Sequence, residues 1–275
     1  MTPPRICRRT AALSLALAGA SLGYFGGVPA AHAGPSAREI MDKVALTRKL
    51  EGSEAIVKMT IAGDKGAPRE RKITLATKLF DGGKTEKRIY RFLEPADVKG
   101  TGVLVFDYET QADDVWIYLP ALRKTRRIVS SQRSQSFMGS EFSYGDLNVP
   151  ALEDYNYALA ADENFGGESC YVIEVTPKDK SIAESEGYSK KTYWVGKDKF
   201  VIRRGLYYDM SGKLLKELRC DDVKMLDPKN KRYRPMKMEM VNKQNGRRSI
   251  FESEKVVFVP ETKDDYFTTR YLEQS

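Results

Sequence analysis

The chain has 275 residues, a formal net charge of +8 and a single histidine, His32. Its first 33 residues have the charge and hydropathy pattern of a secretory signal peptide, so the expected mature chain, residues 34–275, contains no histidine. This composition excludes Ser-His-Asp catalysis, Cys-His catalysis and any histidine-containing zinc site.

The predicted signal peptide has three parts. A start with three arginines precedes the apolar stretch AALSLALAGASLGYF, and Ala31-His32-Ala33 places small residues at positions −3 and −1. We expect cleavage after Ala33, which lowers the net charge to +5, and a periplasmic location. The stretch Leu17-Ala18-Gly19-Ala20 resembles a lipoprotein-processing box without its cysteine, so we expect no lipid anchor. Later apolar runs are shorter than the roughly 18 residues of a membrane helix.

One helix and then many strands are expected along the chain. Residues 36–52, SAREIMDKVALTRKLEG, have apolar residues at near-helical spacing, Ser36 as N-cap with Glu39 three residues later, and Gly52 as the stop. Strands then alternate with turns, as in RKITLATKLF followed by DGGK. Residues 149–160, VPALEDYNYALA, could form a short helix.

The C-terminal half has short strands at regular spacing, separated by turns rich in Gly, Asn, Asp and Pro. This pattern indicates a mainly β fold, an antiparallel sandwich or barrel. Since no linker, low-complexity segment or repeat divides residues 34–275, we expect a single domain. Cys170 and Cys220 both lie in predicted strands; in an oxidising compartment a disulfide is favoured, with two unpaired buried thiols as the alternative.

Residues 123–147 interrupt the strand pattern. The segment begins with the cations Arg123, Lys124, Arg126, Arg127 and Arg133, and continues with Phe137, Met138, Phe142 and Tyr144 among small residues. The cations could form a solvated loop, or a rim that meets anionic lipid headgroups or an acidic partner protein. Export of the chain argues against nucleic acid as the partner.

Bulky apolar side chains alternate with polar ones along many of the predicted strands, which places them on one face of a sheet. They are Tyr90, Phe92, Val103, Val105, Trp116, Tyr118, Tyr193, Val195, Tyr207, Met236, Met238 and Met240. Methionine is conformationally adaptable and suits a surface that accepts varied apolar ligands, although an ordinary core is the other interpretation. The interior is therefore either packed shut or holds an apolar ligand.

No catalytic or cofactor motif is recognisable in the expected mature chain. The pairs Asp113-Asp114, Asp221-Asp222 and Asp264-Asp265 lack the ligand spacing of a calcium loop, and DGGK is not a phosphate-binding glycine loop. We therefore expect no enzyme, no cofactor and no metal.

Three stretches carry a family resemblance. FLEPADVKGTGVLVFDY, DDVWIYLPALRKTRRI and SFMGSEFSYGDL resemble the outer-membrane lipoprotein-sorting protein family, in the superfamily of the periplasmic lipoprotein carrier LolA and its receptor LolB. The later stretches NFGGESCYVIEVTPKD and YWVGKDKFVIRRGLYYDMSGKLLKEL are similar to the recurring pattern of that superfamily. The resemblance covers roughly residues 37–271.

The resemblance implies a strongly curved antiparallel sheet that forms an incomplete barrel, with helical or loop structure as a lid over an apolar cavity. It also implies a carrier that holds the acyl chains of lipoproteins or lipids, contacts membranes transiently, and has an inner-membrane RND-type exporter as a partner. On this view residues 123–133 lie at the mouth, and residues 134–147 form a lid whose Phe137, Met138, Phe142 and Tyr144 face the cavity. The rival hypothesis is a ligand-free module that scaffolds an exporter or senses envelope stress.

Overall fold

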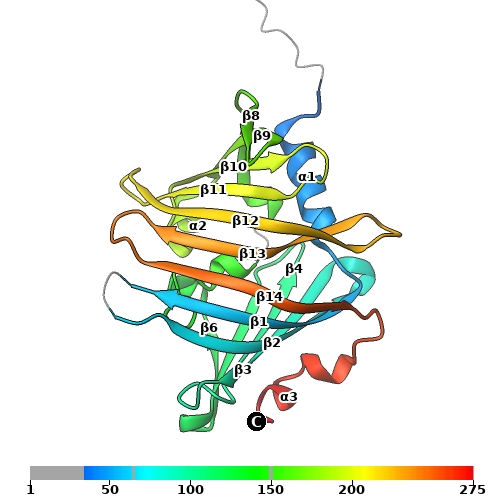
Figure 1. Ribbon diagram of the computed structural model, residues 1–275, viewed down its shortest axis with the longest axis vertical. Coiled ribbons are helices and arrows are strands. Elements are labelled where there is room, and N and C mark those ends of the chain that lie inside the picture. The colour runs from blue at the N-terminus through cyan, green and yellow to red at the C-terminus, as the bar shows by residue number, and fades with distance from the viewer. Residues whose placement is uncertain (1–33, 64–65, 149–150, 275) are drawn as a thin grey trace, which may run out of the picture. The chain divides into compact units, whose positions relative to one another are not determined.

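The computed structural model describes residues 34–63, 66–148 and 151–274 (Figure 1). The predicted signal peptide and its cleavage site lie outside the described residues. The α-helices are α1 (Ala37–Arg48), α2 (Lys180–Glu186) and α3 (Thr269–Leu272). The first strands are β1 (Gly52–Ala62), β2 (Arg69–Phe80), β3 (Thr85–Glu94), β4 (Gly102–Tyr108), β5 (Asp114–Leu119) and β6 (Lys124–Ile128). The later strands are β7 (Tyr155–Leu159), β8 (Glu163–Phe165), β9 (Glu168–Pro177), β10 (Lys190–Gly196), β11 (Ile202–Tyr208), β12 (Leu214–Asp227), β13 (Arg232–Asn242) and β14 (Arg248–Phe258).

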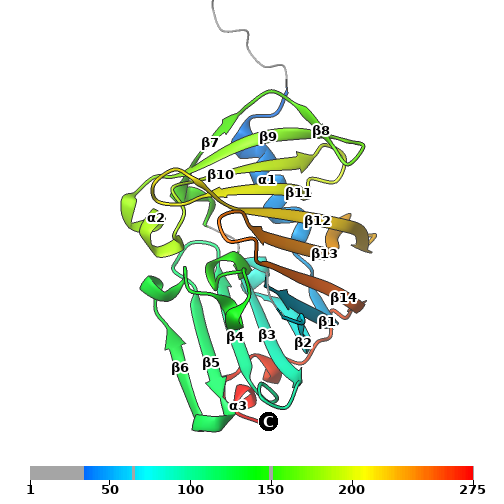
Figure 2. The same cartoon turned by 60° about the vertical axis from the view of Figure 1, so that its left-hand side comes forward.

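All of these strands belong to one 14-stranded antiparallel sheet that curves strongly without closing. The order is β6-β5-β4-β3-β2-β1-β14-β13-β12-β11-β10-β9-β7, with β8 paired to β9. The first half of the chain runs from β1 out to one edge at β6, and the second half starts at the other edge with β7 and returns to β14, which pairs with β1. The chain between β6 and β7 therefore crosses from one edge of the sheet to the other across its concave face (Figure 2). The predicted curved antiparallel sheet with an N-terminal helix is confirmed.

Helix α1 begins as the sequence predicts. The Ser36 side chain accepts a hydrogen bond from the backbone N–H of Glu39, and the Glu39 carboxylate accepts one from the backbone N–H of Ser36. This capping box satisfies N–H groups that the first helical turn leaves free. The predicted stop at Gly52 is wrong, because the helix ends at Arg48 and Gly52 opens β1. Gly52 is needed there for a different reason, since a Cβ atom would collide with the carbonyl oxygen of Val259.

The two faces of the sheet bury different sets of side chains. The concave, inner face carries the largest apolar cluster, to which α1 adds Ile40, Met41 and Val44. On the outer face, the C-terminal segment with α3 packs Phe267 and Leu272 against the outer side chains of β2 to β5. A third, small cluster on the outer face surrounds Trp194. The inner face is therefore the main core of the domain.

The chain that forms β7 is extended, not helical. The short helix considered for residues 149–160 is wrong, because Leu152–Asp154 form one 3-10 turn and Tyr155–Leu159 form the edge strand β7. The alternating side chains of this stretch suit a strand. No helix in the described ranges combines the length and the apolar character needed to cross a lipid bilayer.

Candidate functional site

The chain that crosses the concave face folds back on itself as an irregular hairpin. We call residues 129–148 the crossing segment. The N–H of Phe137 donates to the carbonyl oxygen of Phe142 at 2.7 Å, and the N–H of Tyr144 donates to that of Gln135 at 3.1 Å. The tip is a 3-10 turn, Phe137–Gly139, in which Met138 (φ 50°) and Gly139 (φ 78°) are left-handed. This conformation costs a residue such as methionine about 1 kcal/mol, and the packing of Met138 against the inner cluster offsets that cost.

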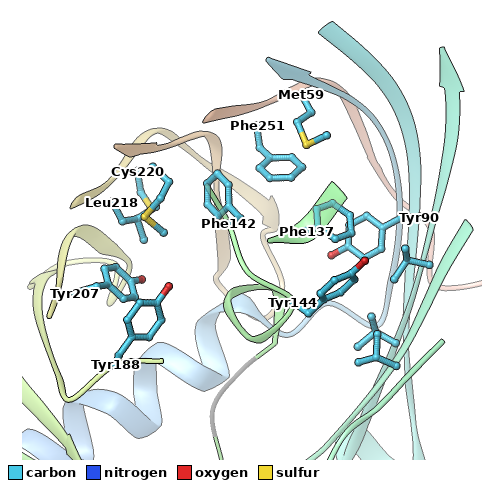
Figure 3. Packing of buried hydrophobic residues seen from close by; sticks show 14 of the residues in the cluster. Met59, Tyr90, Phe137, Phe142, Tyr144, Tyr188, Tyr207, Leu218, Cys220 and Phe251 are labelled. Atoms are coloured by element: carbon cyan, nitrogen blue, oxygen red, sulfur yellow. The ribbon is translucent and has the colours of Figure 1, made fainter. Parts of the chain in front are cut away.

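Aromatic side chains of the crossing segment fill the middle of the concave face (Figure 3). The Phe137 side chain is 0% exposed. Its ring centroid lies 5.7 Å from Tyr90, 6.0 Å from Phe92, 5.6 Å from Tyr144 and 6.2 Å from Phe251. The Phe142 ring packs edge-on against Phe251 at 4.8 Å. Because these rings come from β3, β14 and the crossing segment, the segment acts as an apolar plug seated in the curved sheet.

Polar side chains of the sheet hold the tip of the plug. Arg71 donates a hydrogen bond to the carbonyl oxygen of Met138, and Arg247 donates one to that of Gly139 at 3.2 Å. The Glu141 carboxylate pairs with Arg247 at 3.1 Å and accepts a hydrogen bond from Asn242 at 3.0 Å. These contacts satisfy backbone groups that packing removes from water. The tip is thus held by a few polar contacts around an apolar centre.

A buried charge network holds the end of the crossing segment. Asn148 accepts a hydrogen bond from Arg88 at 3.1 Å and donates one to Asp113 at 2.7 Å. Arg88 also pairs with Asp107 at 2.6 Å, and Arg133 pairs with Asp113 at 3.0 Å. Burial, together with the nearby charge of Asp107, raises the pKa of Asp113 to about 6. This network joins both ends of the crossing segment to β3, β4 and the loop before β5.

A second buried pair lies beside α2. Lys191 on β10 and Glu186 at the end of α2 form an ion pair in which both side chains are buried. The Lys191 ammonium also lies 5.4 Å from the ring of Tyr155 and 5.3 Å from that of Tyr188. Burial opposes its charge, but the carboxylate of Glu186 outweighs this effect and raises the pKa of Lys191 above its ordinary value. The Tyr188 hydroxyl in turn donates to Asp146 of the crossing segment at 3.0 Å.

Most of the apolar residues predicted from the sequence do come together on the inner face. The inner cluster contains Tyr90, Phe92, Val103, Val105, Phe137, Phe142, Tyr144, Tyr193, Val195, Tyr207 and Met240, with Met138 and Met238 packed against it. Met236 is buried two residues before Met238 on the same strand. Trp116 and Tyr118 lie instead in the outer cluster, with Phe267 and Leu272. These two residues are separated from the plug by the sheet.

The predicted basic residues divide into two groups. Arg123, Lys124, Arg126 and Arg127 lie on or next to the edge strand β6 and are exposed, with Arg127 paired to Asp114. Charges on an edge strand also prevent pairing with other sheets. Arg133 differs because Asp113 draws it toward the buried network.

The predicted disulfide is not formed. Both cysteines are buried and free, Cys170 in the small outer cluster and Cys220 in the inner cluster. Their strands, β9 and β12, are separated by β10 and β11, and the two side chains point to opposite faces. Burial raises the pKa of the Cys220 thiol to about 12, which makes it unreactive.

Local sequence patterns do not identify the polar residues that hold the plug. Arg71 is one cation in the run RERK, and only its place on the same face as Ile73 marks it as inward. Asn148 and Asp113 meet across 35 residues of chain, a contact that local patterns do not reveal. Among the described residues, no group of three or more His, Cys, Asp or Glu side chains could hold a metal ion.

Comparisons with known proteins support the fold. A family model whose description reads "Uncharacterized protein" matches residues 84–274. No curated protein matches the chain. Among solved structures, an outer membrane lipoprotein-sorting protein domain from Vibrio parahaemolyticus is 30% identical, with a TM-score of 0.78 over 86% of this chain and 98% of that one.

Two other solved structures are similar. A DUF1329 family protein from Desulfovibrio piger is 29% identical, with a TM-score of 0.78 over 86% of this chain and 97% of that one. A LolA superfamily protein from Nitrosomonas europaea, at 23% identity and a TM-score of 0.65 over 86% of this chain and 100% of that one, shares the fold. The identity and coverage shared with the Vibrio domain show that this chain belongs to the outer membrane lipoprotein-sorting protein family.

Proposed function

We propose that the protein is a non-enzymatic periplasmic carrier that holds acyl chains of lipoproteins or lipids against the concave face of its sheet. The observation that carries this proposal is the aromatic plug. Phe137 and Phe142 are 0% and 4% exposed, and they occupy an interior built from aromatic rings and the side chains of Met59, Met238 and Met240. An acyl chain that replaced these rings would meet the same apolar walls.

The burial of an acyl chain and the exposure of the plug have opposite effects on the free energy of binding. An acyl chain in water costs about 0.8 kcal/mol per CH₂ group, so release from a membrane needs an apolar site of comparable quality. Outward movement of the crossing segment exposes its own rings, which opposes binding, and relaxes the left-handed backbone of Met138. The plug thus lowers the affinity of the protein for the acyl chain. Because the returning plug displaces the cargo, the cargo can be released.

The surface around the crossing segment suits contact with membranes. Exposed Arg123, Lys124 and Arg126 follow the β6 edge, next to the start of the crossing segment. Each cation near an anionic membrane surface contributes about 1 kcal/mol of attraction. In this proposal the edge meets lipid headgroups, or an acidic surface of an RND-type exporter, while the plug moves. The family of the chain supports lipoprotein as cargo, since the Vibrio relative is described as a lipoprotein-sorting domain.

A second function has support from the closed interior itself. The complete burial of Phe137 between Tyr90, Phe92, Tyr144 and Phe251 is also what a permanently filled domain would have. Such a domain would act as a ligand-free interaction module of an envelope exporter or stress-sensing system. It would keep the crossing segment in place with every partner.

The two functions can be separated by what the protein carries. The mature protein is purified from its own periplasm, weighed by native mass spectrometry and extracted with solvent. A carrier is expected to release phospholipid or acylated peptide, and to bind a fluorescent fatty acid after extraction. A clean apo mass together with no uptake of the fatty acid would support the filled interaction module.

A further inference from the structure

The strand β6 and the residues on either side of it form an exposed, basic surface. Residues 121–130 read ALRKTRRIVS and contain four cations and no aspartate or glutamate. Every residue of this stretch is exposed except Thr125 and Ile128. Because β6 pairs only with β5, the stretch lies along a free edge of the sheet (Figure 2). We call residues 121–130 the edge surface.

Three cations of the edge surface have no acidic partner. Arg123, Lys124 and Arg126 form no ion pair within the described part of the chain, whereas Arg127 is ion-paired. Arg126 lies opposite Ile117, a residue of the inner cluster, so Arg126 and Lys124, two residues before it, point toward the concave side. Their charge is therefore available to an anionic partner at the open side of the sheet.

Large apolar side chains flank the same strand. Leu122 precedes β6 and is 63% exposed, and Val129 follows β6 and is 51% exposed. Among the described residues, these are the two most exposed large apolar side chains. They are seven residues apart, a span of roughly 20 Å in an extended chain. The edge surface thus has an apolar group at each end and cations between them.

This combination decides between the kinds of partner that an edge could meet. An edge that only avoids pairing with other sheets needs charges but no exposed leucine or valine. An acidic protein surface would pair with the cations and leave both apolar side chains in contact with polar groups or water. A bilayer with anionic lipids accommodates both kinds of side chain, since its phosphate groups attract the cations and its acyl boundary accepts the apolar groups.

We propose that the edge surface docks on an anionic lipid bilayer, with Leu122 and Val129 inserted at the acyl boundary and the three unpaired cations among the phosphate groups. The inference deepens the proposed function, and it rests on that function only for the purpose of docking, which is to bring the carrier to its lipid. Val129 is also the first residue of the crossing segment. The docked bilayer would therefore lie where the segment that has to move begins.

The test measures binding of the mature protein to vesicles of phosphatidylglycerol and phosphatidylethanolamine in equal parts, by co-sedimentation at low ionic strength. We expect saturable binding, and much weaker binding to vesicles of phosphatidylcholine alone. The double variant Leu122→Ser, Val129→Ser should bind the anionic vesicles about tenfold more weakly, because it has no apolar groups to insert. Its thermal unfolding should be unchanged, since both side chains are exposed.

The matched control for the apolar groups is the double variant Leu46→Ser, Met225→Ser. Leu46 lies on α1 and is 50% exposed, and Met225 lies on β12 and is 46% exposed. This variant loses as many exposed apolar side chains as the test variant, but away from β6. It should bind the vesicles as tightly as the unmodified protein.

The cations are tested by a triple variant, Arg123→Gln, Lys124→Gln, Arg126→Gln. Since each cation near an anionic membrane contributes about fivefold to the affinity, we expect binding to weaken about 100-fold. The matched control loses the same net charge at exposed lysines of the two turns that precede and follow β12, namely Lys213, Lys229 and Lys231. It should retain most of the affinity.

Three results would overturn the proposal. The first is no saturable binding to the anionic vesicles, and the second is an equal loss of affinity in the test variants and their matched controls. The third is binding that the triple variant abolishes but Leu122→Ser, Val129→Ser leaves unchanged. That result would exclude insertion and favour an acidic protein as the partner.

The proposed function is measured separately, by uptake of a fluorescent fatty acid in the absence of vesicles. Uptake without vesicle binding would leave the carrier standing and reject the docking surface. Vesicle binding without uptake would reject the acyl carrier while the docking surface remained assigned.

Discussion

Arg71 on β2 donates a hydrogen bond to the main-chain carbonyl oxygen of Met138, and so connects the wall of the sheet to the tip of the plug. The guanidinium also lies 5.9 Å from the ring centroid of Phe92, beneath Phe137. A charged group on the inner face is costly to bury unless it has partners. Its partner here is the segment that would have to move when cargo binds.

Replacing Arg71 with methionine should therefore favour opening. The variant loses the hydrogen bond to Met138 and gains apolar surface on the inner face. Because a hydrogen bond from a charged donor contributes about 1.5–3 kcal/mol, we expect roughly tenfold tighter binding of a fluorescent fatty acid. The measurement is an equilibrium titration of probe fluorescence.

Arg91→Met is the control for that variant. Arg91 donates to the carbonyl oxygens of Tyr271 and Gln274 on the outer face, so its loss affects the C-terminal segment and not the plug. Its affinity for the fatty acid should equal that of the unmodified protein. Equal affinities for Arg71→Met and Arg91→Met would count against the role of Arg71.

Replacing the Phe137 ring with a smaller side chain should affect fatty-acid binding, whereas the same replacement on the outer face should affect stability alone. Phe137→Leu removes ring atoms from the inner face, and Phe267→Leu does the same on the outer face, where Phe267 packs against Phe80 at 5.7 Å. Each variant should lower the free energy of unfolding in urea by about 1–3 kcal/mol. Only Phe137→Leu should tighten fatty-acid binding, since it weakens the group that competes with the acyl chain. An equal change of affinity in both variants would mean that the effect comes from general destabilisation.

The raised pKa of Asp113 predicts a pH dependence of stability. The pKa is about 6 in the folded protein against an ordinary value of 3.8, so the folded state binds the proton more tightly. Its contribution to stability is complete below about pH 4 and is lost as the pH rises through about 6. Between pH 4 and 7 the free energy of unfolding should fall by on the order of 2 kcal/mol from this residue.

Asp113→Asn is expected to remove this pH-dependent part, which urea titrations at pH 4.5, 5.5, 6.5 and 7.5 would detect. Asp209→Asn is a suitable control. Hydrogen bonds from Ser211 and then from Gln244 lower the pKa of Asp209 to about 2, below the range tested. A pH profile of Asp113→Asn identical in shape to that of the unmodified protein would exclude Asp113 as the titrating group.

The free cysteines predict a simple chemical result. In denaturant without reductant, the mature protein should react with two equivalents of a thiol reagent, one each at Cys170 and Cys220. In the native protein both should react slowly, because both side chains are buried. Reaction only after reduction would show that a disulfide forms after all.

Local sequence signals predicted the start of α1, the many-stranded sheet and the burial of the crossing segment's aromatic rings. The capping box of Ser36 and Glu39 marked the start of α1, and strand alternation marked the sheet. Phe137 and Phe142 stood out because they are large apolar residues in a polar, glycine-containing stretch. Such a residue is seldom left in water, so its burial could be predicted without knowledge of its partner.

Features that depend on long-range packing were not predictable in this way. Alternation divides β5 into two faces, Val115 with Ile117 and Trp116 with Tyr118, but does not say which face is concave. The C-terminal Phe267 and Leu272, about 150 residues further along the chain, pack against Trp116 and Tyr118. This packing places Trp116 and Tyr118 on the outer face. Long-range packing also explains why the disulfide prediction failed. The strands that carry Cys170 and Cys220 could be recognised from the sequence, but the two strands that lie between them in the sheet could not.

The central claim is that an acyl chain takes the place of the crossing segment on the concave face. Hydrogen-deuterium exchange of the mature protein, with and without a bound fatty acid, tests it most directly. We expect faster exchange at the N–H groups of Phe137, Ser140 and Tyr144, whose hydrogen bonds close the plug, and slower or unchanged exchange in β3 and β14. Bound fatty acid that leaves exchange in residues 129–148 unchanged would contradict the account.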